Sequence, residues 1–195
     1  MTKRENVLSL SATERSTLVN GLLAMKKSGT YNKYVRNHAL ATQWTSPTGS
    51  VLNMAHIGPA FLPWHRKFLL DFEHDLRTAT GLADFGLPYY DWTDGLGAGS
   101  AVWAKDLMGG QGNPISSGPF IPSAWPTVDE NSRPTKGLIR QFGAGWPSLP
   151  QRSDVHRAFY RPAYDASPWT DRSSSGLRNA LEGFMPFGLH NLVHV

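Results

Sequence analysis

The 195-residue sequence contains no cysteine. Disulfide bonds, thiolate metal ligands and cysteine nucleophiles are therefore all excluded. A bound transition metal would have to be held by imidazole or carboxylate groups, and the chain has seven histidines. The histidines are therefore the first residues to examine for a functional site.

Long apolar runs are also absent. The first ten residues are polar, unlike a signal peptide, and no stretch approaches the roughly 20 apolar residues of a membrane span. The net charge is +4, but lysine and arginine are scattered along the chain, whereas a nucleic-acid binder concentrates them in a patch. We expect a soluble protein with no membrane or nucleic-acid partner, and a length of 195 residues fits one domain, residues 1–195.

Helical patterns dominate the first 80 residues. Ser11 and Glu14 have the spacing of a capping box, which predicts a helix that ends near Gly29. A second helix is predicted over 31–43, with His38 on its apolar face. Residues 46–50 contain proline and glycine and predict a loop.

A third helix is predicted to begin at Pro63, because proline is well tolerated at the first helical position. His65 falls on the apolar face of this helix, and His74 falls on the opposite side. The inward residues of this face are His65, Phe68, Leu69, Phe72 and Leu76. The pattern therefore predicts that His65 points inward and His74 outward.

Residues 95–176 contain 11 of the 19 glycines and 9 of the 14 prolines, so a long loop-rich insertion is predicted there, with a short helical turn near Asp154. Helical signals return at 177–182, and a last helix is predicted from near Phe187. That helix carries His190 and His194, and the sequence ends one residue later without a stop signal. We therefore expect a C-terminally incomplete domain.

His190 and His194 are spaced i, i+4, which places two imidazoles on one helical face, a common way to grip a metal. The residue after His190 is not the glutamate that a zinc protease uses as a base, so hydrolysis is disfavoured. A single pair of this kind is a weak signal, and an isolated inward histidine is usually a hydrogen-bonded core residue. Spacing alone therefore leaves a metal site and a structural role both open.

The run from His56 to Glu73, which includes Pro59, Phe61, Trp64 and His65, resembles the first copper signature of the tyrosinase family throughout. Residues 87–92, 177–184 and 189–195 are similar to further segments of that family, and small bacterial members are the most similar. The resemblance implies a mainly α fold: a four-helix-bundle dicopper core whose last helix is missing, with a long loop-rich insertion.

Carried over residue by residue, the resemblance implies two copper ions. His38, His56 and His65 would bind the first copper, and His190 and His194 would be two of the three ligands of the second. The family's third ligand to that copper has no counterpart in this sequence. His74 and His156 lack the family's context, and we expect both to be solvated.

The resemblance also assigns Glu182 and Asn191 as catalytic residues that hold a water near the metals, where it can take a phenol's proton. The competing interpretations are an exposed carboxylate at a helix end and an ordinary surface amide. The implied activity is oxidation of phenols by O2, comprising ortho-hydroxylation of monophenols and oxidation of o-diphenols to o-quinones, as in melanin biosynthesis.

The implied partners are a phenolic substrate, O2 and a copper-delivery helper (caddie) protein of the kind that small bacterial tyrosinases often need. The chain would then be cytoplasmic, or secreted with a partner that carries the signal. The alternatives are a catechol oxidase or o-aminophenol oxidase without monophenolase activity, a haemocyanin-like O2-binding protein, and an inactive fragment. We expect the intact protein to be the enzyme and the isolated 195-residue chain to be defective.

Overall fold

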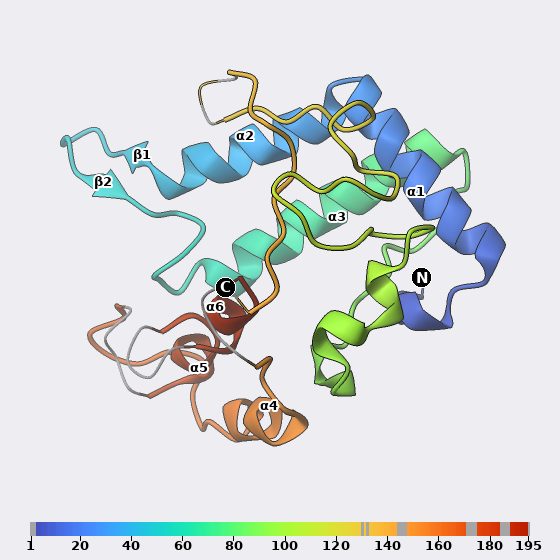
Figure 1. The fold of residues 1–195 in the computed structure, drawn as a ribbon. Coiled ribbons are helices and arrows are strands. Elements are labelled where there is room, and N and C mark those ends of the chain that lie inside the picture. Colours follow the sequence, from blue (N-terminus) through green and yellow to red (C-terminus); the bar gives the residue numbers. More distant parts are fainter. Residues whose placement is uncertain are drawn as a thin grey trace. The chain divides into compact units, whose positions relative to one another are not determined.

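A computed structural model describes residues 3–129, 131, 133–143, 148–170, 175–183 and 188–194, without the side chains of Val51 and His194. The chain is mainly helical, as predicted, and the two short strands β1 and β2 pair with each other (Figure 1). The elements in chain order are η1 (Val7–Ser9), α1 (Ala12–Lys27), α2 (Thr30–Thr42), β1 (Trp44–Thr45), β2 (Val51–Leu52), α3 (Phe61–Thr80), η2 (Trp92–Asp94), η3 (Gly97–Gly99), η4 (Ala101–Trp103), α4 (Arg152–Phe159), α5 (Leu177–Glu182) and α6 (Leu189–His194). None of the helices in the described part is both long and apolar enough to cross a membrane.

The chain forms two compact units. The first comprises Met1–Arg36, Leu69–Asp91 and Ala98–Phe142, and the second comprises Asn37–Phe68, Trp92–Gly97 and Gly143–Val195. The boundaries fall within α2 and α3, so each of these helices contributes to both units. The expectation that residues 1–195 form a single tyrosinase copper-binding domain stays a prediction.

The first unit is built on α1. Its predicted capping box is confirmed, because the Ser11 hydroxyl accepts from the Glu14 N–H and the Glu14 carboxylate accepts from the Ser11 N–H. Leucines and a methionine on one face of this helix enter the core. At Gly21 the helix lies against α3 so closely that an added Cβ would be 2.6 Å from Thr80 Cγ2 and 2.8 Å from Leu76 Cδ1. The missing side chain at Gly21 therefore permits this close packing.

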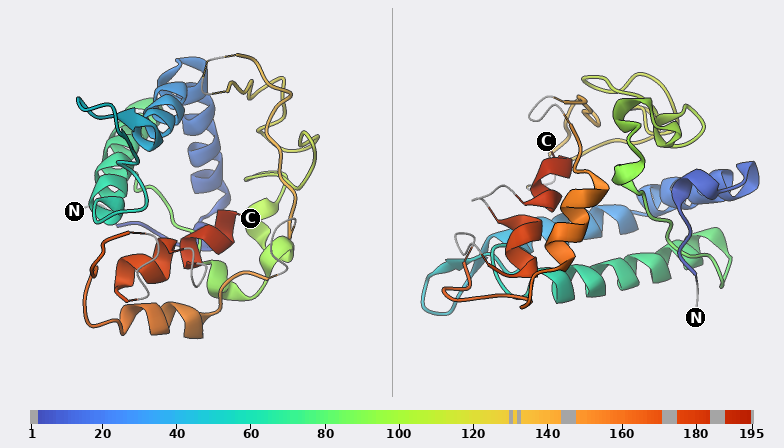
Figure 2. Two further views of the ribbon diagram at one scale, coloured as in Figure 1. Left: turned by 90° about the vertical axis from the view of Figure 1, so that its left-hand side faces the viewer. Right: turned by 90° about the horizontal axis from the view of Figure 1, so that it is seen from below.

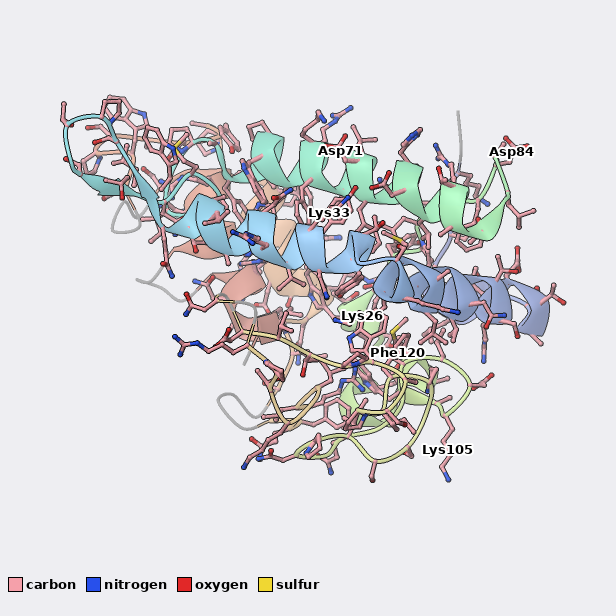
Figure 3. The ribbon with its side chains drawn as sticks, turned by 90° about the horizontal axis from the view of Figure 1, so that it is seen from above. Lys26, Lys33, Asp71, Asp84, Lys105 and Phe120 are labelled. Carbon is pink, nitrogen blue, oxygen red and sulfur yellow. The ribbon has the colours of Figure 1, made fainter. Side chains whose placement is uncertain are left out.

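Lys26, at the end of α1, joins the loop-rich segment to this core. Its ammonium group lies 5.1 Å from the ring centroid of Trp125 and 5.6 Å from that of Tyr31, and it donates to Asn32 Oδ1 at 2.6 Å. Phe120 packs edge-on against Trp125 in the same cluster. Lys26 and Phe120 are labelled in Figure 3. Cation–π contacts and one hydrogen bond thus compensate the burial of this lysine, and burial lowers its pKa.

In the second unit, the end of α2 leads into a hairpin, and the chain then returns to the start of α3 (Figure 1). The hairpin is antiparallel and pairs Trp44 with Leu52 and Thr45 with Val51. The predicted loop over 46–50 is confirmed as the hairpin turn. The strands themselves were not predicted, because two residues each are too short to show an alternating pattern.

Two details of α3 differ from the prediction. The helix begins at Phe61 rather than at Pro63, which lies within the first turn. Backbone N–H groups of a first turn have no intrahelical partner, so proline is tolerated there as well as at the first position. Leu69 was expected on the inward face but is 38% exposed, whereas Leu76 on the same face is fully buried.

In the second unit, α5 lies next to both α4 and α6 (Figure 2). α4 begins at Arg152 with Gln151 as its N-cap, which confirms the short helical turn predicted near Asp154. The Gln151 N–H donates to the Asp154 carboxylate at 2.8 Å. α5 confirms the helix predicted over 177–182. The predicted start of the last helix near Phe187 lies outside the described residues, and the described helix begins at Leu189.

Candidate metal centre

Three imidazoles of the second unit converge. His38 comes from α2, His56 from the loop before α3, and His65 from the first turns of α3. Each offers one ring nitrogen, and these nitrogens all lie within 4.8 Å of one another. The Nε2 atoms of His38 and His56 are 3.1 Å apart. A metal–imidazole bond is about 2 Å long, so two nitrogens bound to one ion are at most about 4 Å apart. The Nε2 atoms of His38 and His56 meet this requirement.

The orientation of His65 is fixed by its own helix. The Nδ1 atom lies 2.8 Å from the backbone carbonyl of Phe61, one turn earlier. A carbonyl can only accept, so Nδ1 carries the proton and Nε2 keeps the lone pair. Histidines that bind metals commonly hold their other ring nitrogen in this way.

His56 lies on a loop that is held at several points. The His56 N–H donates to Asn53 Oδ1 at 2.7 Å, and the next N–H, that of Ile57, donates to Glu182 Oε2 at 3.0 Å. Ile57 has a φ of 64°, a conformation that is unfavourable for a β-branched residue. Residues held in such strained conformations cluster at functional sites, where neighbouring groups enforce them.

A tyrosine from the insertion holds the same loop. The Tyr164 hydroxyl donates to the carbonyl of Pro59 at 2.8 Å and accepts from the Leu62 N–H at 3.4 Å. Burial raises the pKa of Tyr164, and the nearby charge of Asp165 acts in the same direction. The hydroxyl therefore stays protonated and remains a donor at neutral pH.

Glu182, at the end of α5, is 3% exposed and lies against His56. Its Oε2 atom is 3.5 Å from His56 Nδ1, and its Oε1 atom is 3.2 Å from Arg178 Nη1. Arg178 is fully buried and also binds Asp165. Burial lowers the pKa of the Arg178 guanidinium, but the bonds to Asp165 and Glu182 outweigh it, so its pKa is raised. The interpretation of Glu182 as an exposed carboxylate at a helix end is therefore wrong.

α6 places His190 beside the three-histidine group. Its ring centroid lies 5.5 Å from that of His56 and 6.2 Å from that of His65, and the Phe61 ring is 5.1 Å from it. The Asn191 side chain donates to the backbone carbonyls of Glu182 and Gly183 at 3.0 and 3.1 Å, and its Oδ1 is 3.3 Å from His190 Nδ1. Asn191 thus contacts the backbone of Glu182 and not its carboxylate.

The remaining histidines follow the sequence predictions where they can be compared. His194 ends α6, but its side chain lies outside the described residues. His74 and His156 are exposed, on α3 and α4 respectively, and neither belongs to the three-histidine group. The structure therefore brings together His38, His56, His65 and His190 and leaves His74 and His156 at the surface.

Sequence reasoning missed Arg178, Asp165 and Tyr164. Arg178 precedes Glu182 by four residues, a spacing that places the two side chains on one helical face, so this pair could have been found. Asp165 and Tyr164 lie in the loop-rich insertion, where no periodicity indicates which side chains return to the site.

The donor chemistry of the cluster fits copper. All ligand atoms in the three-histidine group are imidazole nitrogens, which suit copper as well as zinc. Neutral imidazole binds both Cu(I) and Cu(II), as a metal that changes oxidation state requires. The fold and the site thus define a mainly helical protein in which three imidazoles lie close together, as they do in proteins that bind a metal through histidines.

Comparison with known proteins identifies the family. A family model described as the common central domain of tyrosinase matches residues 28–195. Tyrosinase from Streptomyces antibioticus is 38% identical over 201 residues, covering 100% of this chain and 71% of that protein. Grixazone synthase from Streptomyces griseus is 31% identical over 98% of this chain and 73% of its own length. The chain belongs to the tyrosinase family of enzymes.

A solved structure of a functional unit from octopus hemocyanin was also matched. The match covers 55% of this chain and 29% of the hemocyanin chain, with 23% identity and a TM-score of 0.42. Family membership therefore rests on the sequence matches.

Proposed function

We propose that this protein uses two copper ions to oxidise phenols with O2, hydroxylating monophenols at the ortho position and oxidising o-diphenols to o-quinones. His38, His56 and His65 would hold the first copper, and His190 and His194 would supply two ligands of the second. The observation that carries the proposal is the convergence of three imidazole nitrogens within 4.8 Å in a chain of the tyrosinase family.

When bound, the copper ions would supply the electron transfer between phenol and O2. The protein's own residues hold and orient the ligands and manage protons. A phenol has a pKa near 10, so it is mostly protonated at neutral pH and its oxidation requires a proton acceptor. We assign this task to Glu182 and Asn191 acting with a water; the support is their position beside His56 and His190.

A second candidate is an oxidase without monophenolase activity, acting on catechols or o-aminophenols. The observation that favours it is the match to grixazone synthase over 98% of the chain, because that family member carries a name other than tyrosinase. A haemocyanin-like O2 carrier is a third possibility and differs from both enzymes by turning over neither substrate.

The test is product analysis with a monophenol and with a catechol. A preparation in which both coppers are bound is expected to convert both substrates to o-quinone, and His65→Ala is expected to abolish both conversions. His74→Ala, an exposed histidine of the same helix, is the matched control and should behave as wild type. Conversion of the catechol alone would establish the second candidate, and binding of O2 without turnover of either would establish the carrier.

The copper-delivery helper protein is part of the proposal. Co-expression with such a helper is expected to raise the copper content of the purified protein. An unchanged copper content with and without a helper, at full occupancy, would remove the helper from the account.

A further inference from the structure

The fully buried Arg178 makes a two-pronged contact with Asp165. Its Nε and Nη2 atoms each lie 2.8 Å from a different carboxylate oxygen of Asp165. Nη2 also donates to the Thr170 carbonyl at 2.9 Å and to Asn179 Oδ1 at 3.0 Å. A planar guanidinium bound through both prongs has little freedom to turn.

The third nitrogen of the same guanidinium reaches towards the imidazole cluster. Arg178 Nη1 lies 3.2 Å from Glu182 Oε1. The other oxygen of that carboxylate accepts from the Ile57 N–H at 3.0 Å and lies 3.5 Å from His56 Nδ1. Asp165, Arg178, Glu182 and His56 therefore form one continuous chain of polar contacts within the second unit.

These polar contacts orient the His56 imidazole, which lies at their end. With Nδ1 turned towards the Glu182 carboxylate, His56 presents Nε2 to His38, 3.1 Å away. A carboxylate held on one side only could rotate about its side-chain bonds, and the imidazole would lose the negatively charged neighbour, 3.5 Å from Nδ1, that favours its Nδ1–H form. Neighbours of this kind determine which nitrogen of a histidine is left to bind a metal.

We propose that Arg178 is a positioning residue for His56: anchored by Asp165, it holds the Glu182 carboxylate so that the His56 imidazole keeps Nε2 directed at the three-histidine group. This inference rests on the proposed function, because the value of the orientation lies in copper binding. It assigns Glu182 a contact with the ligand His56 in addition to its proposed part in proton transfer.

The first measurement needs no metal. The ¹⁵N chemical shifts of the imidazole nitrogens report which ring nitrogen carries the proton. In the metal-free wild type, His56 is expected in the Nδ1–H form, and in Arg178→Gln it is expected as a mixture of the two forms. Arg157→Gln, which changes an exposed arginine of α4 in the same unit, is the matched control and should leave His56 unchanged.

The second measurement is Cu(I) affinity by competition with a chromophoric chelator, on variants shown to be folded by circular dichroism. Loss of a residue that orients a ligand typically weakens metal binding by about 10- to 100-fold, and Arg178→Gln is expected to fall in this range. Arg178→Lys keeps the charge but not the planar fork, so an intermediate affinity is expected. If Arg178→Gln does not fold, Arg178→Lys is compared with wild type and must show both the mixed His56 forms and weaker binding.

The outcomes separate this inference from the proposed function. Folded Arg178 variants with wild-type Cu(I) affinity and an unchanged Nδ1–H form of His56 would overturn the inference while leaving the copper site in place. Failure of the wild type itself to bind Cu(I) would overturn the proposed function, whereas the metal-free measurement on His56 would still report on Arg178.

Discussion

The backbone N–H of Ile57 donates to the carboxylate of Glu182 at 3.0 Å, across 125 positions of the chain. This bond ties the loop that carries His56 to the end of α5, and it is made by a residue in the left-handed region, with a φ of 64°. Strain of this kind costs on the order of 1–3 kcal/mol and persists only when surrounding contacts enforce it. The contact therefore connects the conformation of the His56 loop to the buried polar contacts that Glu182 makes with Arg178 and that Arg178 makes with Asp165.

The close approach of α1 and α3 predicts the effect of Gly21→Ala. The new Cβ would lie 2.6 Å from Thr80 Cγ2 and 2.8 Å from the side chain of the fully buried Leu76. Overpacking of this kind costs about 1–3 kcal/mol and should outweigh the gain of up to about 1 kcal/mol in helix propensity. Urea unfolding should show a lower free energy of unfolding.

The control for Gly21→Ala is Asn20→Ala, at the exposed neighbouring position of the same helix. It gains helix propensity without a clash, so it should be neutral or slightly stabilising. If Gly21→Ala proved as stable as Asn20→Ala, α1 and α3 would not approach as closely as described.

The buried carboxylate of Glu73 predicts a pH dependence of stability. Burial alone would raise the pKa of Glu73, but the hydrogen bonds from Arg4 and from the Leu87 N–H, with the charges of Arg4 and Arg77, lower it below its ordinary value of 4.5. A lowered folded-state pKa means that the unfolded state binds protons first as the pH falls. The stability from these bonds is therefore complete above the ordinary pKa and is lost as the pH falls through the lowered one.

Glu73→Gln should lower the free energy of unfolding at neutral pH by about 1–3 kcal/mol and should flatten its decline below about pH 4.5. The measurement is urea unfolding over a series of pH values. Asp84→Asn, at an exposed position of the first unit, is the control and should keep the wild-type pH profile. A Glu73→Gln profile parallel to that of wild type would contradict the assignment.

Much of the fold could be predicted from local patterns. The capping box at Ser11 and the apolar periodicity of α1 depend on neighbours within a few residues, so the sequence shows them directly. The start of α3 was placed two positions late, at Pro63, because proline is compatible with every position of a first turn. The hairpin after α2 is too short to leave a periodic signal.

The residues of the site likewise divide into those that local sequence patterns predict and those that only the tertiary structure places. The inward positions of His38 and His65 follow from helical periodicity, and the assignment of His56 required the family resemblance. The partners that hold His56 come from distant segments, and the loops that bring Tyr164 and Asp165 to it have no periodicity. Glu182 was singled out by resemblance, but its burial and its contact with Arg178 follow from tertiary packing alone.

The hydrogen bonds of Tyr164 to the His56 loop predict that a substitution at Tyr164 weakens copper binding modestly. Tyr164→Phe removes the hydroxyl that donates to Pro59 and accepts from the Leu62 N–H. Loss of the shorter of these bonds, the one to Pro59, costs about 0.5–1.5 kcal/mol by itself, so Cu(I) affinity should fall by at least roughly 2- to 12-fold as the His56 loop loosens. Tyr160→Phe, at a side chain that is 84% exposed, is the control in the chelator competition. Equal Cu(I) affinities of the two variants would show that Tyr164 does not hold the loop.

The most direct test of the central claim is the copper content of the 195-residue chain, loaded with Cu(I) without oxygen, freed of excess metal and measured by elemental analysis. The account predicts that His65→Ala retains about one copper per chain less than wild type, because one ligand of a three-imidazole site is gone. His74→Ala, an exposed histidine of the same helix, should match wild type. Equal copper contents in His65→Ala and wild type, or no copper in either, would contradict the assignment of His38, His56 and His65 as a copper site.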